Sequence, residues 1–361
     1  MDRVLSHLRE LVAFDSRNPP RNITADEGMF PWLCRALPGF RHELSDLGNG
    51  CVSLLAVRGN PSTVFNVHMD TVPDSPRWTR PPLELGLSGN RATGLGACDI
   101  KGAAACLIAA AEQTDGPLAL LFTSDEEHDG GRCIQHFLDS PHGFKQAIVS
   151  EPTTCRAVLA HRGIASVRVQ FAGVAGHSSS SRALTDNALH RAAAWIGRAV
   201  EFAADSSHTY QNLSGLAFNV GTVKGGIKNN VIAPDAKLTF GIRPLPGQDS
   251  DALLDTLREL SPQDQVASWE RSFFGPSLPA KAGGGDDPVA EARAFASSLD
   301  FEITEAVDFW TEASLFSAAG VPAIVFGPGD IAQAHTADEW VSLAQLETAF
   351  DSYVRVINRG L

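Results

Sequence analysis

The sequence predicts an α/β protein that is interrupted by a smaller α+β part. In the first part of the chain, and again near its end, short apolar runs alternate with helical patterns, as in a layered α/β fold with some parallel pairing. Between them, a run such as 166–171 alternates apolar and polar residues, as half-solvated antiparallel strands do. The length of 361 residues fits about two domains of ~150 residues each.

The first part of the chain is expected to hold one helix followed by buried strands. Apolar residues recur at helical spacing over 4–12, and the pattern stops before Pro19 and Pro20, which cannot continue a helix. Four short apolar runs are then predicted to be buried strands, at 51–57, 63–67, 118–123 and 147–149. The Ala-rich segment 102–113 predicts a packed helix between the second and the third of them.

The middle part has the element order β-α-β-β-α-β, which is that of a ferredoxin-like sandwich. Its predicted strands lie at 166–171, 216–223, 236–242 and 266–272, and its helices at 186–203 and 253–260. A Pro- and Gly-rich connector at 275–288 follows, and then a helix near 289–299, a strand at 323–326 and a helix from Leu343. We therefore predict a discontinuous α/β domain, 1–161 and 276–361, with an inserted domain at 162–275.

Composition and charge argue against several classes of protein. A hydrophobic fraction of 43% and a charged fraction of 20% are globular values, which argues against disorder. The formal charge of −13, without any Lys/Arg run, disfavours nucleic acid and anionic membranes as partners. The longest wholly apolar stretch, 103–111, is far shorter than the ~20 residues that span a bilayer. Six cysteines without a Cys-x-x-Cys pair, and no secretory signal, favour reduced thiols and a cytoplasmic setting.

Polar residues follow the predicted strands at the edge where open α/β sheets bind their ligands. They are His68 and Asp70 after the second strand, Asp125, Glu126 and Glu127 after the third, Glu151 after the fourth, His335 after the strand near the end, and Asp99 in the loop before the Ala-rich helix. Two imidazoles with at least three carboxylates form a hard N/O ligand set, which suits Zn²⁺ or Co²⁺ in an open catalytic site. Taken singly, each of these residues could be an ordinary polar residue with no role in metal binding. Their joint occurrence at one edge favours a metal site.

This ligand set is larger than one tetrahedral ion needs. A carboxylate such as Asp99 can bridge two ions ~3.5–4 Å apart, as in dinuclear hydrolases. Asp70 lies two residues after His68, on the same face of a strand, and is placed to hold the imidazole by its other N–H.

Three other patterns carry less weight. Gly94-Leu95-Gly96 before a helix is part of a dinucleotide-binding pattern, but Asp99 replaces the third glycine and would repel a pyrophosphate. A metal cluster of His128, Cys133 and His136 is disfavoured because two glycines separate His128 from the others. No Gly-x-Ser-x-Gly motif supports a serine hydrolase.

Four blocks of the chain resemble the M20 metallopeptidase/deacylase family, and its acetylornithine deacetylase branch in particular. They are His68-Met69-Asp70-Thr71-Val72-Pro73, Gly96-Ala97-Cys98-Asp99-Ile100-Lys101-Gly102, Thr123-Ser124-Asp125-Glu126-Glu127 and Glu151-Pro152-Thr153. The resemblance continues through Ala175-Gly176-His177-Ser178, Asn219-Val220-Gly221, Gly225-Gly226, Asn229-Asn230, Arg243-Pro244, Gly247, Gly327-Pro328-Gly329 and Ala334-His335-Thr336. It covers nearly the whole chain in order. It implies a zinc-exopeptidase-like catalytic domain with an inserted ferredoxin-like lid and dimerisation domain.

The resemblance also implies a role for each residue of the site. The implied metal ligands are His68, Asp99 as the bridge, Glu127, Glu151 and His335. The general base would be Glu126, and Asp70 would orient a ligand histidine. His177 would donate to the oxyanion, in its own site or in that of a partner subunit. Arg243 would pair with the α-carboxylate of the substrate. The segment 224–230, with Gly226, Asn229 and Asn230, would face the ligand.

The activity implied by the resemblance is metal-dependent hydrolysis of the N-acetyl amide of an amino acid. It is of the acetylornithine or acetylcitrulline deacetylase type in arginine biosynthesis, with one or two Zn²⁺ ions or with Co²⁺, and with a homodimer formed through the inserted domain. A succinyl-diaminopimelate desuccinylase and an M20 exopeptidase share these ligands and stay open. Glu126 argues against a non-catalytic metal-bearing module.

The chain departs from the family pattern at Leu95, where Arg is common, at Ala103, where Gly is usual, and in the serine run after His177. These departures bear on substrate preference and leave the metal site intact.

Overall fold

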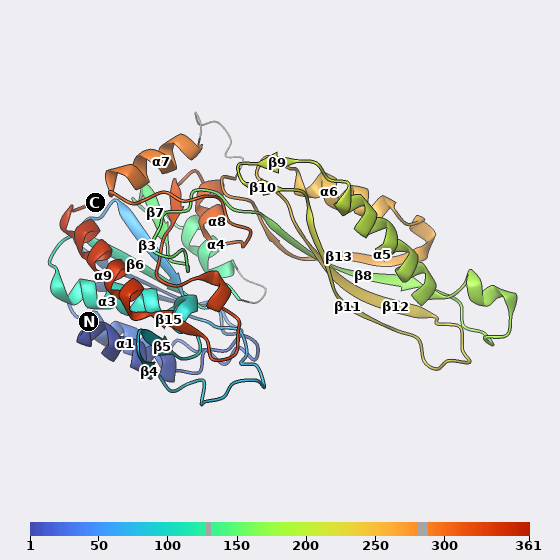
Figure 1. Ribbon diagram of the computed structural model, residues 1–361, viewed down its shortest axis with the longest axis horizontal. Coiled ribbons are helices and arrows are strands. Elements are labelled where there is room, and N and C mark those ends of the chain that lie inside the picture. The colour runs from blue at the N-terminus through green and yellow to red at the C-terminus, as the bar shows by residue number, and fades with distance from the viewer. Residues whose placement is uncertain (128–130, 281–287) are drawn as a thin grey trace. The chain divides into compact units, whose positions relative to one another are not determined.

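The computed structural model describes residues 1–127, 131–280 and 288–361, which form two compact units. The first unit comprises Met1–Leu159, Ala282–Thr304 and Thr311–Leu361, and the second comprises Ala160–Lys281 and Glu305–Trp310 (Figure 1). Half of the predicted connector at 275–288 lies outside the described residues, and so does His128. Among the residues described, no helix combines the length and the apolar character needed to cross a membrane.

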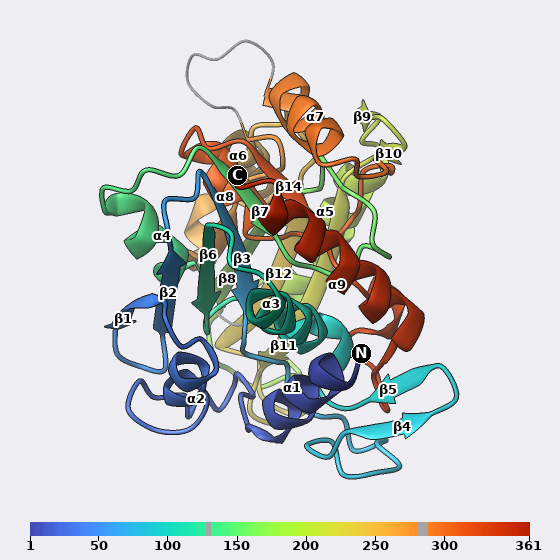
Figure 2. The same cartoon turned by 90° about the vertical axis from the view of Figure 1, so that its left-hand side faces the viewer.

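The first unit is built on a six-stranded mixed sheet with the order β1-β2-β6-β3-β7-β14 (Figure 2). Its strands are β1 (Arg41–Asp46), β2 (Val52–Arg58), β3 (Thr63–His68), β6 (Leu118–Thr123), β7 (Gln146–Val149) and β14 (Ala323–Val325). Strands β6, β3, β7 and β14 run parallel, whereas β2 is antiparallel to both β1 and β6. Every residue of β3 and β6 is buried, as expected for parallel strands that are covered on both faces.

Helices cover this sheet on both faces. Helix α3 (Gly102–Gln113) packs between α1 (Asp2–Ala13) and α9 (Leu343–Asn358), and Figure 2 shows all three in front of the sheet. Ten of the twelve residues of α3 are buried, and most are alanines, which allow its neighbours to approach closely. Helix α8 (Ala313–Ala318) packs on β7 and β14, and its Phe316 contacts Phe137 of α4 (Arg132–Asp139).

The remaining elements of the first unit lie around this core. They are α2 (Met29–Ala36), α7 (Pro288–Ser298) and a three-stranded sheet of β15 (Trp340–Ser342), β5 (Arg91–Thr93) and β4 (Gly86–Ser88). Strand β15 pairs with β5 directly before the loop that carries Asp99. The small sheet therefore brings the segment after His335 next to that loop.

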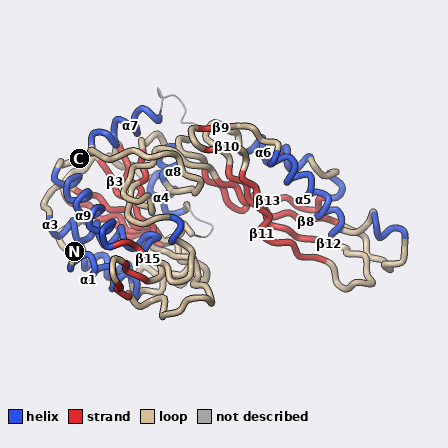
Figure 3. The backbone as a smooth tube through the Cα atoms, viewed as in Figure 1, coloured by secondary structure: helices blue, strands red, loops and turns tan. Residues whose placement is uncertain are grey.

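The second unit is a four-stranded antiparallel sheet with the order β11-β12-β8-β13. Its strands are β8 (Ile164–Ala172), β11 (Ala217–Gly225), β12 (Asp235–Arg243) and β13 (Val266–Gly275). Helices α5 (Ala188–Ala204) and α6 (Ser250–Glu259) lie along one face, as Figure 3 shows. Fully buried Trp195 of α5 packs against Phe240 of β12, while a short hairpin of β9 (Thr209–Tyr210) and β10 (Leu213–Ser214) precedes β11. With that hairpin set aside, the chain order is β-α-β-β-α-β.

An N-cap residue with a hydrogen-bonding side chain precedes each of these two helices. The carboxamide of Asn187 accepts hydrogen bonds from the first backbone N–H groups of α5, and the carboxylate of Asp249 does so for α6. Such caps satisfy N–H groups that have no partner within the helix.

Candidate metal centre and active site

The candidate site of the first unit lies where neighbouring parallel strands end. His68 is the last residue of β3, Glu126 and Glu127 follow β6, and Glu151 follows β7. Because β6, β3 and β7 are adjacent in the sheet, these side chains reach one edge of it. The segment after β14 then supplies His335, and the irregular turn before α3 supplies Asp99.

The side-chain ligand atoms form three groups, each small enough to hold one ion. His68, Asp99 and Glu151 form one group, and Asp99, Glu127 and His335 form a second; within each, the ligand atoms lie within 4.8 Å of one another. Asp99 is common to these two groups. A third group of His68, Glu126 and Glu127 overlaps them. The structure therefore brings all five predicted metal ligands and Glu126 together around Asp99.

His68 is held on both sides of its ring. Its Nε2 lies 3.0 Å from Oδ1 of Asp99 and 3.8 Å from Oε1 of Glu151. Its Nδ1 lies 3.1 Å from the main-chain oxygen of Asp70, and 3.7 Å from the carboxylate of that residue. The closer contact is with the main chain, whereas the sequence pattern pointed to the carboxylate. In either case Nδ1 faces an acceptor, which leaves Nε2 facing the carboxylates.

His335 approaches Asp99 from the other side. Its Nε2 lies 3.2 Å from Oδ2 of Asp99 and 3.2 Å from Oε1 of Glu127. The side chain of His335 is 51% exposed, whereas that of Glu127 is 5% exposed. The two oxygens of Asp99 thus face different histidines, which is the arrangement that a bridging carboxylate requires.

Burial and neighbouring charges both shift the pKa values of this cluster, and at His68 they act in opposite directions. Burial, together with neighbouring carboxylates, raises the pKa of Glu126 and of Glu151 well above the usual range. Hydrogen bonds with Asp99 and Glu127 raise the pKa of His335 to about 11. Burial acts to lower the pKa of His68, but the carboxylates of Asp70 and Asp99 raise it well above normal. The cluster therefore concentrates negative charge that a cation would stabilise.

The carboxylate of Asp70 organises the loop that carries the predicted base. It accepts hydrogen bonds from the backbone N–H groups of Glu126, at 3.3 Å, and Glu127, at 3.0 Å. It also accepts one from the side-chain amide of buried Asn18, at 2.8 Å. Asn18 was not singled out in the sequence, where it stands before two prolines and is typical of a turn.

A second residue that the sequence reasoning missed is Glu339, which is 2% exposed. Its carboxylate accepts hydrogen bonds from the backbone N–H groups of Gly96, at 3.0 Å, Cys98, at 2.8 Å, and Asp99, at 3.0 Å. The only sequence signal was its place four residues after His335.

The predicted substrate-binding residues of the second unit fall into two separate places. At one end of the sheet, His177 forms a β-bridge with Val231, and the N–H of Ser178 donates to the main-chain oxygen of Asn230. The Nδ1 atom of His177 lies 2.8 Å from the hydroxyl of Ser179. Gly226, Asn229 and Asn230 are exposed in the same loop region. The structure brings His177 and this loop together.

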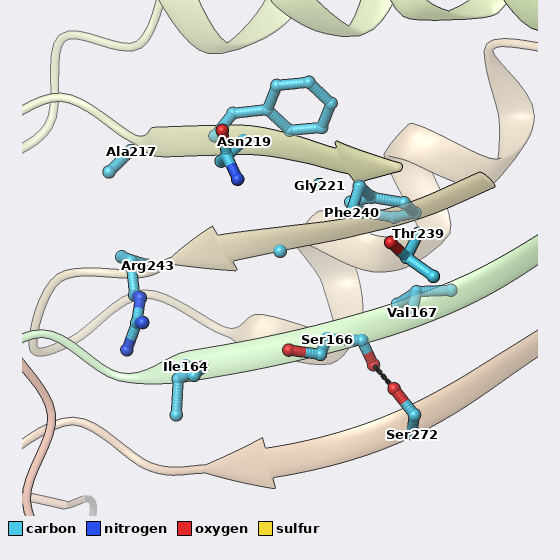
Figure 4. A pocket seen from close by; sticks show the side chains of 12 residues that line it. Ile164, Ser166, Val167, Ala217, Asn219, Gly221, Thr239, Phe240, Arg243 and Ser272 are labelled. Carbon is cyan, nitrogen blue, oxygen red and sulfur yellow. Dashed lines mark hydrogen bonds between the residues drawn. The ribbon is translucent and has the colours of Figure 1, made fainter. Parts of the chain in front are cut away.

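Arg243 lies at the other end of the sheet. It is the last residue of β12, and it lines a cavity of about 320 Å³ with Asn219, Ser166 and Ser272 (Figure 4). The nine-residue strand β12 spans about 26 Å at ~3.3 Å per residue. His177 follows β8 at the end of the sheet where Asp235 begins β12 and pairs with Ala172. One chain therefore does not bring Arg243 and His177 together within the second unit.

The weaker sequence patterns contribute nothing to these groups. Within the described part of the chain, Cys133 and His136 belong to none of the three ligand groups. Cys133 is buried, and burial raises the pKa of its thiol. All six cysteines are free thiols.

Comparison with known proteins gives the family of the chain. The model of the family described as Peptidase family M20/M25/M40 matches residues 64–359. N-acetyl-L-citrulline deacetylase of Xanthomonas campestris pv. campestris is 52% identical over 360 residues, which are 98% of this chain and 97% of the relative. Acetylornithine deacetylase of Myxococcus xanthus is 32% identical, with 94% of this chain and 92% of the relative covered.

The fold is shared with solved structures. A crystal structure of an M20 family metallo-carboxypeptidase from Sulfolobus solfataricus matches with a TM-score of 0.78 and 16% identity over 99% of both chains, which shows a common fold alone. On the evidence of the family match and of these relatives, the chain belongs to peptidase family M20.

Proposed function

We propose that this protein is a metal-dependent deacetylase that hydrolyses the N-acetyl amide of an amino acid, with N-acetyl-L-citrulline as its preferred substrate. The observation that carries the reaction type is the position of Asp99, whose two oxygens face His68 and His335 in two adjoining ligand groups. The relative that is 52% identical over nearly the whole length of both chains supports the choice of substrate.

The residues of the site fit one or two divalent ions. Two imidazoles and three carboxylates form the hard N/O set that Zn²⁺ and Co²⁺ accept. Burial, and then the surrounding carboxylates, raise the pKa of Glu127 and of Glu151. A bound cation would therefore stabilise the ionised form of both groups. We assign His68, Asp99 and Glu151 to one ion, and Asp99, Glu127 and His335 to the other.

The chain's own residues then divide the work of the reaction. When bound, the ions supply Lewis-acid polarisation of the amide carbonyl and acidify the attacking water. Glu126 takes a proton from that water and delivers it to the nitrogen of the leaving amine, a general acid–base role worth about 10²–10⁴-fold. The raised pKa of Glu126, which burial causes, suits a group that must both accept and return a proton. Acetate and a free amino acid are the products.

Two residues of the second unit are proposed to recognise the substrate. Arg243 binds the α-carboxylate through its planar guanidinium, and the cavity beside it offers room for that end of the molecule. His177 donates a hydrogen bond to the oxygen that becomes negative as the amide is attacked. We expect Gly226, Asn229 and Asn230 to contact the ligand beside His177.

The separation of these two residues supports a homodimer formed through the second unit, which serves as the lid. Arg243 and His177 lie at opposite ends of a strand that spans about 26 Å, so one small substrate does not reach both in a single chain. In a dimer with two-fold symmetry, His177 of one subunit can serve the site of the other. The inserted segment that forms this lid domain is proposed to be 162–275, with 1–161 and 276–361 as the catalytic domain.

A place in arginine biosynthesis follows from the proposed substrate, and the cytoplasm is the compartment that we propose for it. Six free thiols in a chain of this length suit a reducing compartment.

The proposed function is tested by comparing kcat/KM for N-acetylcitrulline, N-acetylornithine and N-acetylmethionine with purified, Zn²⁺- or Co²⁺-loaded protein. We expect N-acetylcitrulline to exceed N-acetylornithine by at least tenfold, about 1.4 kcal/mol in transition-state binding. Equal or reversed values would overturn the substrate. Hydrolysis of succinyl-diaminopimelate or of dipeptides, with none of the acetylated amino acids, would overturn the deacetylase and favour the desuccinylase or the exopeptidase instead.

A further inference from the structure

We propose that Glu339 is a positioning residue that fixes the shared carboxylate Asp99 and ties its loop to the segment that carries His335. The inference rests on the proposed two-ion site, and it concerns a residue that makes no contact with substrate. It is carried by four hydrogen bonds and by the burial of the groups that make them.

The first step is the number of bonds that one side chain supplies. The Oε1 atom of Glu339 accepts from the N–H groups of Cys98 and Asp99, and Oε2 accepts from the N–H of Gly96. The main-chain oxygen of Glu339 adds a fourth bond, which it accepts from the N–H of Gly94 at 3.0 Å. Glu339 therefore holds four backbone groups within six residues of the turn before α3.

The second step is that this turn cannot hold its shape by regular helical bonding. Asp99 and Ile100 have non-helical backbone angles within it, and Gly96 has a φ of +77°. Backbone N–H groups that point inward in such a turn need an acceptor, because burying them without one is destabilising. Glu339 is that acceptor, and the hydrogen bonds it accepts from the N–H groups of Cys98 and Asp99 constrain the backbone from which the Asp99 carboxylate extends.

The third step is charge. A buried carboxylate needs compensation, and the fully buried ammonium of Lys101 interacts favourably with the charge of Glu339. Lys101 is itself anchored, since its Nζ donates to the main-chain oxygen of Phe14 at 3.0 Å. The Glu339 carboxylate and the backbone N–H groups of the turn thus form a buried hydrogen-bond network, and Lys101 adds a positive charge that acts on it without a direct bond.

The fourth step is the link to the second histidine. Glu339 follows His335 by four residues and directly precedes β15, which pairs with β5 just before the turn. One side chain therefore couples the positions of Asp99 and His335, whose contact of 3.2 Å joins two segments far apart in the sequence. Partners of this kind, which hold metal ligands without binding the metal, affect metal affinity by about 10–100-fold when they are replaced.

The test compares Glu339→Gln with the wild type and with Thr114→Val. Glutamine keeps the size of the side chain, but its amide group would face the N–H of Gly96 and donate instead of accepting. Thr114 is a buried control in the same unit. Its hydroxyl donates to Ala110 and accepts from Arg58, away from the turn. Both variants lose buried hydrogen bonds, and only one of them touches the Asp99 turn.

The first measurement is amide hydrogen exchange of the peptide 94–101 in chelator-treated protein, so that no metal contributes. We expect exchange of this peptide to accelerate at least tenfold in Glu339→Gln, whereas strand β3 of the same variant exchanges at the wild-type rate. In Thr114→Val we expect the peptide 94–101 to exchange at the wild-type rate. Unchanged exchange in Glu339→Gln would overturn the inference. Glu339→Asp, whose shorter side chain does not reach all three of the backbone N–H groups that the Glu339 carboxylate binds, replaces Glu339→Gln if the latter does not fold, with the same expected and contradicting results.

The second measurement is Zn²⁺ titration of the same proteins. In Glu339→Gln we expect the affinity for the more weakly bound of the two Zn²⁺ ions to fall at least tenfold. In Thr114→Val we expect both Zn²⁺ ions to bind with wild-type affinity. If Glu339→Gln binds both Zn²⁺ ions with wild-type affinity, the inference is overturned and the proposed function stays intact. A wild type that binds fewer than two equivalents would overturn the two-ion site, and the exchange experiment would then decide separately whether Glu339 holds the turn.

Discussion

Glu126 is the residue on which the proposed chemistry depends, because it belongs to neither of the two ligand groups that share Asp99. Its carboxyl group is close to His68 and Glu127 and has a pKa that burial raises well above normal. A group in that position can act as a proton carrier, or it can be a further metal ligand. The two roles have different consequences when the carboxylate is replaced by an amide.

We expect Glu126→Gln to lower kcat by about 10²–10⁴-fold, because the amide neither takes a proton from water nor returns one to the amine. Metal content, measured on the purified variant by mass spectrometry of the elements, should stay at the wild-type value. A variant that keeps more than a few per cent of kcat would remove Glu126 as the base. A variant that has lost an equivalent of metal would make it a ligand.

The histidines predict how metal binding depends on pH. In the metal-free protein, hydrogen bonds with Asp99 and Glu127 raise the pKa of His335 to about 11, and the pKa of His68 is also raised. The ring of His335 therefore carries a proton at pH 7 that an ion must displace, and the raised pKa of His68 acts in the same direction, so affinity should rise with pH and binding should release protons.

Calorimetric titration with Zn²⁺ in two buffers of different ionisation enthalpy measures that release. We expect at least about one proton per ion between pH 6 and 8, and about one fewer in total for His335→Gln. Binding that releases no protons over this range, or that weakens as the pH rises, would contradict the assignment of the two histidines.

At the scale of elements, the turn between β5 and α3 is the most demanding piece of backbone at the site. Gly96 has a φ of +77°, and a Cβ added there would lie 2.6 Å from Cγ2 of Thr71 and 3.0 Å from Cδ of Lys101. Gly89 also has a positive φ, of +56°, but a Cβ there would meet nothing within 4 Å. A side chain at Gly96 would therefore meet both backbone strain and crowding, whereas one at Gly89 would meet backbone strain alone.

We expect Gly96→Ala to lower the free energy of unfolding by about 2–4 kcal/mol, because strain and overpacking add. Gly89→Ala, which adds strain alone, should cost about 1–2 kcal/mol. Urea denaturation of the two metal-free variants beside the wild type gives both values. Equal losses would mean that Gly96 is required for its φ alone.

The sequence predicted those elements whose apolar pattern reflects burial. The predicted helix at 102–113 is α3, and the predicted strands at 63–67 and 118–123 are β3 and β6, within one residue at each end. Strand β1 was not predicted because its residues are mostly exposed and polar, and it exists through pairing with β2. The α/β fold class and the family are confirmed.

The site was predictable because most of its residues directly follow parallel strands, which end at one edge of the sheet. His68, Glu127 and Glu151 each follow a strand with a clear apolar run, so the topology of parallel strands brings them together. Asn18 and Glu339 follow no such rule. They reach the site through loops, and only three-dimensional contacts show that their side chains hold Asp70 and the Asp99 turn.

At the scale of the whole molecule, the question is whether one chain forms a complete site. His177 and Arg243 lie at opposite ends of the sheet of the second unit, which is the reason for proposing a dimer with shared sites. A dimer of this kind makes a specific prediction for mixtures of inactive variants.

We expect His177→Ala and Glu126→Gln to be nearly inactive alone, and their equimolar mixture, refolded or co-expressed, to recover about a quarter of wild-type activity. In half of the dimers formed at random, one of the two sites would combine an intact Glu126 with His177 of the partner subunit. Analytical ultracentrifugation of the wild type is the control for the dimer itself. A mixture without recovered activity would place His177 in the site of its own chain.

The central claim is that two ions bound around Asp99 make this chain a deacetylase. Its most direct test is to titrate Zn²⁺ into chelator-treated protein while measuring release of free amine from N-acetyl-L-citrulline. We predict that activity is absent without metal, appears as the ions bind, and reaches its full value by two equivalents per chain, with none at any metal concentration in Asp99→Ala. Full activity in the chelated protein, or in Asp99→Ala, would contradict the claim.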